Sequence, residues 1–111
     1  MRYIVVLTTV EDKGEAENIA KKAVEARLAA CVQIYGPITS IYRWKGRVEE
    51  AEEWVCLFKT KATIYEELEE FLVKEHPYKV PEIIALPISK GFKQYLKWVE
   101  DGTCQKKSPE G

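Results

Sequence analysis

The only histidine of the chain, His76, opens a run over residues 76–82 that reads His-Pro-Tyr-Lys-Val-Pro-Glu. An imidazole titrates near neutral pH and is a common nitrogen ligand for metal ions. Pro77 and Pro81 fix their own φ angles and restrict the residues before them, so the run predicts a rigid entry into a strand. Two roles stay open for His76: a metal ligand or proton-transfer group in a cleft between subunits, or a helix-end side chain that caps backbone carbonyls.

Four further side chains form a candidate cleft around this histidine: Lys59, Tyr78, Glu82 and Glu53. Lys59 leaves an apolar strand, and it either binds an anion or lays its aliphatic stem along the surface. Tyr78 and Glu82 are interpreted as structural neighbours of His76, and Glu82 could also orient the imidazole. Glu53 either pairs with a nearby lysine or arginine or belongs to a solvated face, which the acidic pattern around it favours.

Catalysis would require several of these groups to meet. Lys59, Tyr78 and His76 would make an acid/base site if they converged. The sequence contains no nucleophile motif, no phosphate-binding loop and no paired-carboxylate signature. We therefore expect a binding protein rather than an enzyme.

Three cysteines, Cys31, Cys56 and Cys104, occur at wide spacings. An odd number at such spacings predicts neither a disulfide framework nor a metal-binding Cys-x-x-Cys pair. Cys56 lies within an apolar strand pattern and is expected to be a small buried hydrophobe. Cys31 is either a small residue in a sheet, which its context favours, or a metal ligand.

The size and composition predict one folded domain over residues 1–102 and a flexible polar tail over residues 103–111. Apolar residues make up 46% of the 111 residues, which suits an ordinary core. The 17 basic residues nearly balance the 18 acidic ones, which argues against binding to nucleic acid. No apolar run approaches the length of a membrane span, and the chain starts directly with a fold element, so no membrane contact and a cytoplasmic location are expected.

The apolar pattern predicts elements in the order β-α-β-β-α-β, followed by a further helix. Strands are expected over residues 4–7, 31–44, 48–60 and 83–88, with a bulge or kink at residues 36–37 and a tight turn at residues 45–46. This order predicts an α+β sandwich of the ferredoxin-like type, with one antiparallel sheet and two helices on one of its faces.

Polar residues mark the expected helix starts. Asp12 is expected to cap the first helix, which should end near residues 27–28, and Thr63 is expected to open a capping box for the second. The third helix should begin at Ser89. Its inward-facing residues are expected to be Phe92, Tyr95, Leu96 and Val99.

The central hairpin is long for a domain of this size. Residues 33–44 span about 40 Å when extended, whereas the radius of gyration of such a domain is about 13 Å. Either the hairpin bends at residues 36–37, or its far end needs another subunit to cover Ile41, Tyr42 and Trp44. We favour packing in such an interface over ligand stacking as the role of the two aromatic residues.

Several stretches together resemble the CutA divalent-cation tolerance family, and they cover nearly the whole chain. They are Arg-Leu-Ala-Ala-Cys-Val at 27–32, Ser-Ile-Tyr-Arg-Trp-Lys-Gly at 40–46, Lys-Thr at 59–60, the His-Pro run at 76–82, and Tyr-Leu-Lys-Trp at 95–98. The resemblance implies a ferredoxin-like subunit and a tight homotrimer like that of the PII signalling proteins. It also implies a cytoplasmic setting, a role in heavy-metal tolerance and binding of divalent copper.

The same resemblance implies metal positions at Thr8, Glu75 and His76, with Cys31 matching a further family cysteine. His76 is then the only nitrogen ligand, and a threonine hydroxyl competes poorly with imidazole or thiolate for copper. Weak copper(II) binding is therefore expected. The alternative is a PII-like sensor or adaptor that binds a small anionic ligand at the subunit interfaces, although the short turn at residues 45–46 offers no long docking loop.

Overall fold

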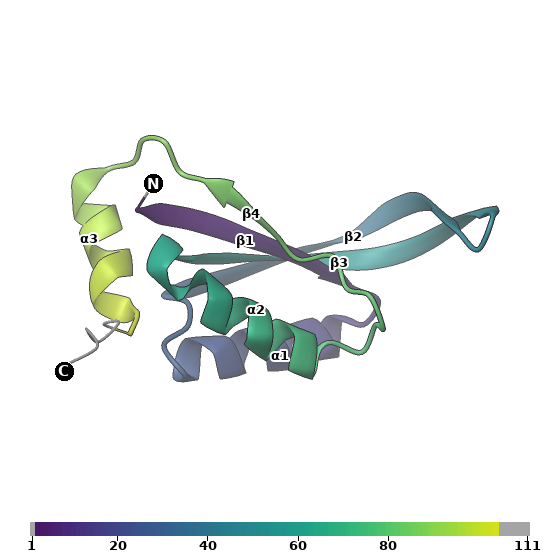
Figure 1. Cartoon of the computed structure of the whole chain (residues 1–111), viewed down its shortest axis with the longest axis horizontal. Coiled ribbons are helices and arrows are strands. Elements are labelled where there is room, and N and C mark those ends of the chain that lie inside the picture. Colours follow the sequence, from purple (N-terminus) through teal and green to yellow (C-terminus); the bar gives the residue numbers. More distant parts are fainter. Residues whose placement is uncertain (1, 105–111) are drawn as a thin grey trace.

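A four-stranded antiparallel sheet in the order β2-β3-β1-β4 organises the computed structural model, which describes residues 2–104 (Figure 1). The elements in chain order are β1 (Tyr3–Val10), α1 (Lys13–Glu25), β2 (Cys31–Trp44), β3 (Arg47–Lys61), the short 3₁₀ turn η1 (Ala62–Ile64), α2 (Tyr65–Glu75), β4 (Ile84–Pro87) and α3 (Lys93–Gly102). This is the predicted α+β order, with the additional helix at its end.

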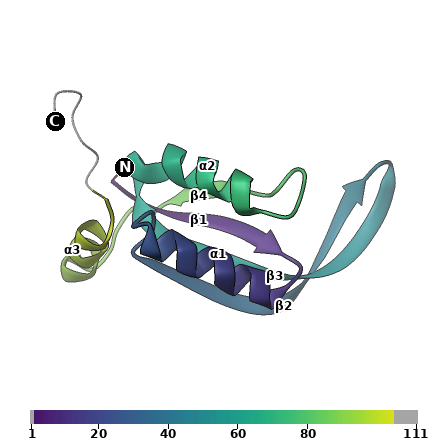
Figure 2. The same ribbon diagram turned by 90° about the horizontal axis from the view of Figure 1, so that it is seen from below.

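Both α1 and α2 cover the same face of the sheet. Alternate residues of β1 and β3, including Val6 and Phe58, meet Ile19 of α1 and Leu68 of α2 in one buried cluster. Because side chains alternate between the faces of a strand, these contacts place the two helices on one side (Figure 2). The alanines of α1 let this helix approach the sheet closely, and the predicted layering is confirmed.

The first helix begins as predicted and ends slightly earlier. The carboxylate of Asp12 accepts a hydrogen bond from the Glu15 backbone N–H at 3.0 Å. At the other end Arg27 takes a φ of 60°, and the Leu28 N–H donates to the Ala23 carbonyl. This is the left-handed arrangement that ends many helices, so the helix stops at Glu25 rather than at residues 27–28.

The two other predicted caps are wrong. Thr63 lies inside η1, and α2 starts at Tyr65 without a side-chain cap, because the tight turn leaves no extended cap residue there. The third helix starts at Lys93, four residues after Ser89, and it also lacks a side-chain cap. The prediction that its apolar residues all face inward is also wrong, since Phe92 is 71% exposed and only Val99 is buried.

The hairpin of β2 and β3 projects beyond the helices (Figure 1). The register between the two strands shifts between Tyr35 and Ile38, which confirms the predicted irregularity at residues 36–37. Gly36 has a φ of 152°, and a Cβ there would lie 2.9 Å from the Glu53 carbonyl oxygen. Lys45 and Gly46 have φ angles of 51° and 78°, the pair of positive values that a tight two-residue hairpin turn requires.

The folded domain continues slightly past its predicted boundary at residue 102. Thr103 is buried and donates from Oγ1 to the Val99 carbonyl at 3.0 Å, and the Cys104 N–H donates to the Arg27 carbonyl. The rest of the predicted tail, residues 105–111, lies outside the described residues. Within residues 2–104, no helix has the length and apolar character needed to cross a membrane.

Candidate functional site

The imidazole of His76 is held by the backbone at both ring nitrogens. Its Nε2 lies 2.9 Å from the Thr9 carbonyl oxygen, and its Nδ1 accepts from the Tyr78 N–H at 3.1 Å. Because Nδ1 accepts, Nε2 must carry the proton and donate to Thr9. Burial lowers the pKa of His76, although the Thr9 carbonyl and nearby carboxylates oppose this effect. The geometry is that of a neutral histidine fastened to a carbonyl of strand β1, whereas the sequence left open a side chain that caps carbonyls at its own helix end.

The residues implied as metal ligands do not converge on one site within a single chain. Glu75 forms an ion pair with Lys22, Oε1 to Nζ at 3.0 Å, and Cys31 lies opposite Lys59 on the neighbouring strand. Thr8 is fully buried, and its Oγ1 has no hydrogen-bond partner. Among residues 2–104 no three His, Cys, Asp or Glu side chains lie together as a metal site.

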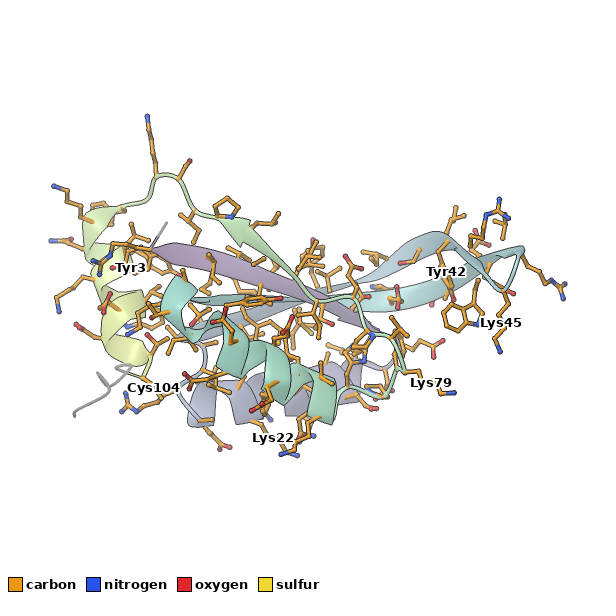
Figure 3. The ribbon with its side chains drawn as sticks, viewed as in Figure 1. Tyr3, Lys22, Tyr42, Lys45, Lys79 and Cys104 are labelled. Carbon is orange, nitrogen blue, oxygen red and sulfur yellow. The ribbon has the colours of Figure 1, made fainter. Side chains whose placement is uncertain are left out.

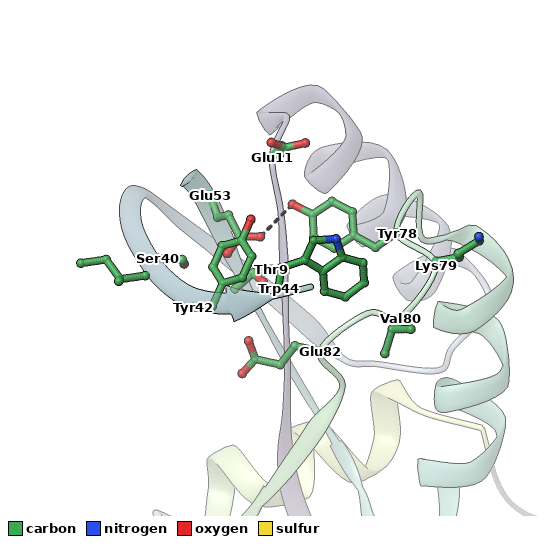
Figure 4. Close-up of a pocket in the computed structure, with 11 residues that line it drawn as sticks. Thr9, Glu11, Ser40, Tyr42, Trp44, Glu53, Tyr78, Lys79, Val80 and Glu82 are labelled. Carbon is green, nitrogen blue, oxygen red and sulfur yellow. Dashed lines mark hydrogen bonds between the residues drawn. The ribbon is translucent and has the colours of Figure 1, made fainter. Parts of the chain in front are cut away.

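Glu53 and Tyr78 do meet, as their shared place in the candidate cleft predicts. Glu53 is only 8% exposed, and its Oε2 accepts from the Tyr78 hydroxyl at 2.7 Å (Figure 4). Burial and the neighbouring carboxylate together raise the pKa of Tyr78 above its ordinary value. The phenol therefore stays protonated and acts as a hydrogen-bond donor, and the predicted solvated position of Glu53 is wrong because the tyrosine ring and the strands cover it.

These two residues line a cavity of about 580 Å³ between the distal part of the hairpin and the loop after α2. Its aromatic and charged lining residues are Tyr42, Trp44, Tyr78, Glu11, Glu53, Glu82 and Lys79. Lys79 points its amino group away from the three rings, so the carboxylates dominate the interior (Figure 4). The cavity is consequently an acidic space with aromatic walls.

The sequence did not single out Glu11 or Lys79. Glu11 directly follows β1, and β1 and β3 are antiparallel neighbours with Val10 opposite Trp54, so the end of β1 lies beside Glu53. The sequence alone does not show which residues of β1 and β3 lie opposite each other, so it could not place Glu11 beside Glu53. Glu82 lines the cavity instead of orienting the imidazole, because both nitrogens of His76 are already bound to backbone groups.

Lys59 lies in another part of the molecule. Its Nζ donates to Gln33 Oε1 at 2.7 Å and sits 5.9 Å from the centre of the Tyr95 ring. It lies six positions from Glu53 along β3, a distance of about 20 Å in an extended strand. The acid/base site that Lys59, Tyr78 and His76 would have made is therefore not assembled within one chain.

The three residues predicted to form a subunit interface are exposed in the single chain. Ile41 is 68%, Tyr42 44% and Trp44 47% exposed, all on the projecting hairpin. Figure 3 shows Tyr42 and Lys45 at this end of the molecule, far from α3 and Cys104. Tyr42 and Trp44 also line the cavity, so the same segment provides both an uncovered apolar surface and a ligand-sized space.

The fold and the cavity define a ferredoxin-like α+β protein with a small-ligand space between its hairpin and the loop after α2. The model of the family described as CutA1 divalent ion tolerance protein matches residues 4–102. The chain belongs to this family, which confirms the resemblance found in the sequence.

Individual relatives agree with this assignment. The divalent-cation tolerance protein CutA of Thermus thermophilus is 50% identical over 99 residues, which cover 89% of this chain and 96% of the relative. The human protein CutA is 44% identical over 86% of this chain, but the match spans only 53% of that longer protein. The crystal structure of CutA1 from Oryza sativa superimposes with a TM-score of 0.92 at 37% identity, covering 96% of this chain and 97% of that one.

One solved relative differs in its stated location. The CutA of Archaeoglobus fulgidus, 36% identical with a TM-score of 0.88 over 90% of this chain and 97% of that one, is described as a periplasmic divalent cation tolerance protein. The family assignment is therefore compatible with more than one compartment.

Proposed function

We propose that this protein contributes to tolerance of divalent cations as a homotrimer that binds copper(II) or another divalent cation weakly. The observation that carries the metal part is the position of His76, the only imidazole of the chain. The negative charges of Glu15 and Glu53 reach this side chain, since both raise its pKa against the larger effect of burial. Negative charge around a nitrogen donor attracts a cation and stabilises it once bound. The names of the relatives support a role in cation tolerance.

The hydrogen bonds of His76 explain why the affinity would be low. A metal ion at Nδ1 must displace the Tyr78 N–H, and one at Nε2 must displace the contact with the Thr9 carbonyl. Leaving such a buried group unpaired costs about 1–3 kcal/mol. We expect dissociation constants on the order of micromolar, because this cost lowers an affinity that already depends on few ligands.

The trimer part is supported by the face of the sheet opposite α1 and α2, which α3 covers only at one end. We call it the open face, and its apolar residues are Val5, Leu7, Tyr35, Leu57, Ile84 and Leu86. Tyr35, Ile84 and Leu86 are each about half exposed, at 51%, 45% and 48%. An apolar patch of this kind is normally covered by a partner. Three copies is the number that the family resemblance implies.

The alternative, a sensor of small anionic ligands, fits the cavity less well. Glu11, Glu53 and Glu82 line it against a single lysine that points away. An anion placed there would be repelled, whereas a cation would be attracted.

A cytoplasmic location forms part of the proposal. Cys31, Cys56 and Cys104 are all free thiols, and free thiols persist in reducing compartments. The alternative compartment is the one stated for the Archaeoglobus relative.

Copper titration of the purified protein tests the metal part. Isothermal calorimetry at pH 7.5 should give micromolar binding that His76→Ala weakens at least tenfold, while Cys104→Ser leaves it unchanged. Light scattering in the same buffer should give three times the subunit mass for both variants. Equal copper affinity in the wild type and in His76→Ala would refute the assigned ligand, and a monomer at micromolar concentration would refute the assembly.

A further inference from the structure

Glu53 is a buried carboxylate that lacks a cationic partner within the described chain. It is 8% exposed, and none of the ion pairs among residues 2–104 includes it. Its hydrogen bond comes from the neutral hydroxyl of Tyr78, which satisfies one oxygen but supplies no positive charge. Because a buried charge is costly unless it is paired, the arrangement is incomplete without a cation.

The walls around this carboxylate indicate which kind of cation fits. Tyr42, Trp44 and Tyr78 present three aromatic rings to one cavity, and the faces of such rings attract ammonium and guanidinium groups. A divalent metal ion instead needs several oxygen ligands that converge on one point. The carboxylates of Glu11, Glu53 and Glu82 do not converge in this way, since no three acidic, histidine or cysteine side chains of residues 2–104 lie together as a metal site. The cavity therefore suits a weakly hydrated organic cation better than a metal ion.

Its size and charge agree with that choice. About 580 Å³ lies within the range of small-molecule sites, roughly 300–1,000 Å³. Glu11 and Glu82 add negative charge at opposite sides of the aromatic rings, as Figure 4 shows. A cation near Glu53 would thus lie between aromatic faces and within the field of two further carboxylates.

We propose that this cavity binds the ammonium or guanidinium group of an organic cation, with Glu53 as its counter-ion and Tyr42, Trp44 and Tyr78 as its aromatic walls. This inference goes beyond the proposed role in metal tolerance, because it needs neither His76 nor copper. The group can come from a free small molecule or from the basic turn of the hairpin on a second copy of this chain. That turn has three basic residues, Arg43, Lys45 and Arg47.

The test measures binding of agmatine, which has one guanidinium and one ammonium group, to the assembled protein by isothermal calorimetry at low ionic strength. Wild type should bind agmatine, and Glu53→Gln should weaken this binding at least tenfold. Glu52→Gln is the matched control, because Glu52 is the exposed neighbour on the same strand and does not line the cavity. Its agmatine affinity should equal that of the wild type.

A triple variant, Arg43→Ala, Lys45→Ala and Arg47→Ala, distinguishes the two sources of the cation. If the hairpin turn of a second copy occupies the cavity, removal of its basic side chains should raise the agmatine affinity several-fold above that of the wild type. If a free small molecule is the natural occupant, the two affinities should be similar. Agmatine binding to neither protein would overturn the proposal.

Equal agmatine affinity in the wild type and in Glu53→Gln would also overturn it. Should Glu53→Gln unfold, as judged by circular dichroism, Glu82→Gln replaces it: loss of this lining carboxylate should weaken agmatine binding at least threefold, and unchanged affinity would be equally decisive. Copper titration of the same samples separates the two proposals. If His76→Ala binds agmatine as the wild type does, its copper affinity tests only the proposed metal role and leaves the organic-cation site supported.

Discussion

The two halves of the β2–β3 hairpin have opposite environments although they belong to the same pair of strands. Near the helices, Cys56 and Phe58 are fully buried against α1 and α2. Beyond the register shift, Ile41 and Val48 are each 68% exposed. The difference teaches that the helices of this chain cover only the proximal half, so the apolar residues of the distal half stay exposed in a single chain, and the proposed trimer would cover them.

The candidate site lies at the border between these halves. Glu53 is the strand residue opposite Ile38, at the point where the register shifts. The proximal half supplies its rigid position, and the distal half supplies Tyr42 and Trp44 as walls. A change in either half should therefore have a distinct consequence, stability in one case and assembly or binding in the other.

The largest expected effect is in the proximal half. Phe58→Ala should lower the free energy of unfolding by about 3–5 kcal/mol, because it removes a fully buried ring and leaves a cavity. Urea unfolding followed by circular dichroism measures this. The control in the distal half is Val48→Ala, which should change the value by no more than about 0.5 kcal/mol. A loss below about 1 kcal/mol for Phe58→Ala would contradict the comparison.

The matching change in the distal half should act on assembly. Replacement of both Tyr42 and Trp44 by alanine should weaken subunit association by about 2 kcal/mol or more, since aromatic anchors dominate interface energies. Sedimentation equilibrium over a dilution series would detect the dissociation. Far-UV circular dichroism of the dissociated subunit should stay unchanged, because neither side chain belongs to the helix-covered core. Unaltered association would mean that the hairpin is not an interface.

The junction of the two halves should be sensitive to a single methyl group. Gly36→Ala should cost about 1–3 kcal/mol of unfolding free energy, because the residue has a φ of 152° and the new Cβ would press on the Glu53 carbonyl. Thermal unfolding monitors this loss. Gly46→Asn at the hairpin turn is the control, since asparagine tolerates a φ of 78° and nothing lies near its Cβ. Equal melting temperatures for the two variants would contradict this account.

The smallest effect should be a pH dependence. Burial lowers the pKa of folded His76, so the unfolded chain binds a proton more readily. Stability contributed by the neutral imidazole should be complete above the unfolded value of about 6.5 and decrease as the pH falls below it. Urea midpoints between pH 5 and 8 measure this. His76→Gln should remove this dependence of stability on pH, because the chain has no other histidine. If the dependence persists in the variant, it arises from carboxylates instead.

Most of the fold could be predicted from the sequence, because local patterns determine it. The Asp12 cap and the turn at residues 45–46 depend on neighbouring residues, and the order of strands and helices along the chain followed from the apolar pattern. The caps at Thr63 and Ser89 failed because a cap also requires an extended backbone, which a polar residue type does not ensure.

The site was less predictable. The sequence placed Glu53, Tyr78 and Glu82 in one group, and the structure brings all three to one cavity. The sequence could not exclude Lys59 from the candidate cleft. Only the strand register shows that Lys59 lies opposite Cys31, in the proximal half of the hairpin and away from the cavity. Nor could the sequence find Glu11, because only the pairing of β1 with β3 brings the end of that strand beside Glu53.

The sequence by itself thus determined the element order, the family and the unusual length of the hairpin, since these depend on local composition and spacing. Only the tertiary structure decided that His76 donates to the Thr9 carbonyl and that Glu53 is buried without a cation. The physical reason is that hydrogen-bond partners and burial depend on strand register and on which face the helices cover. Those are relations between distant segments, and no local pattern records them.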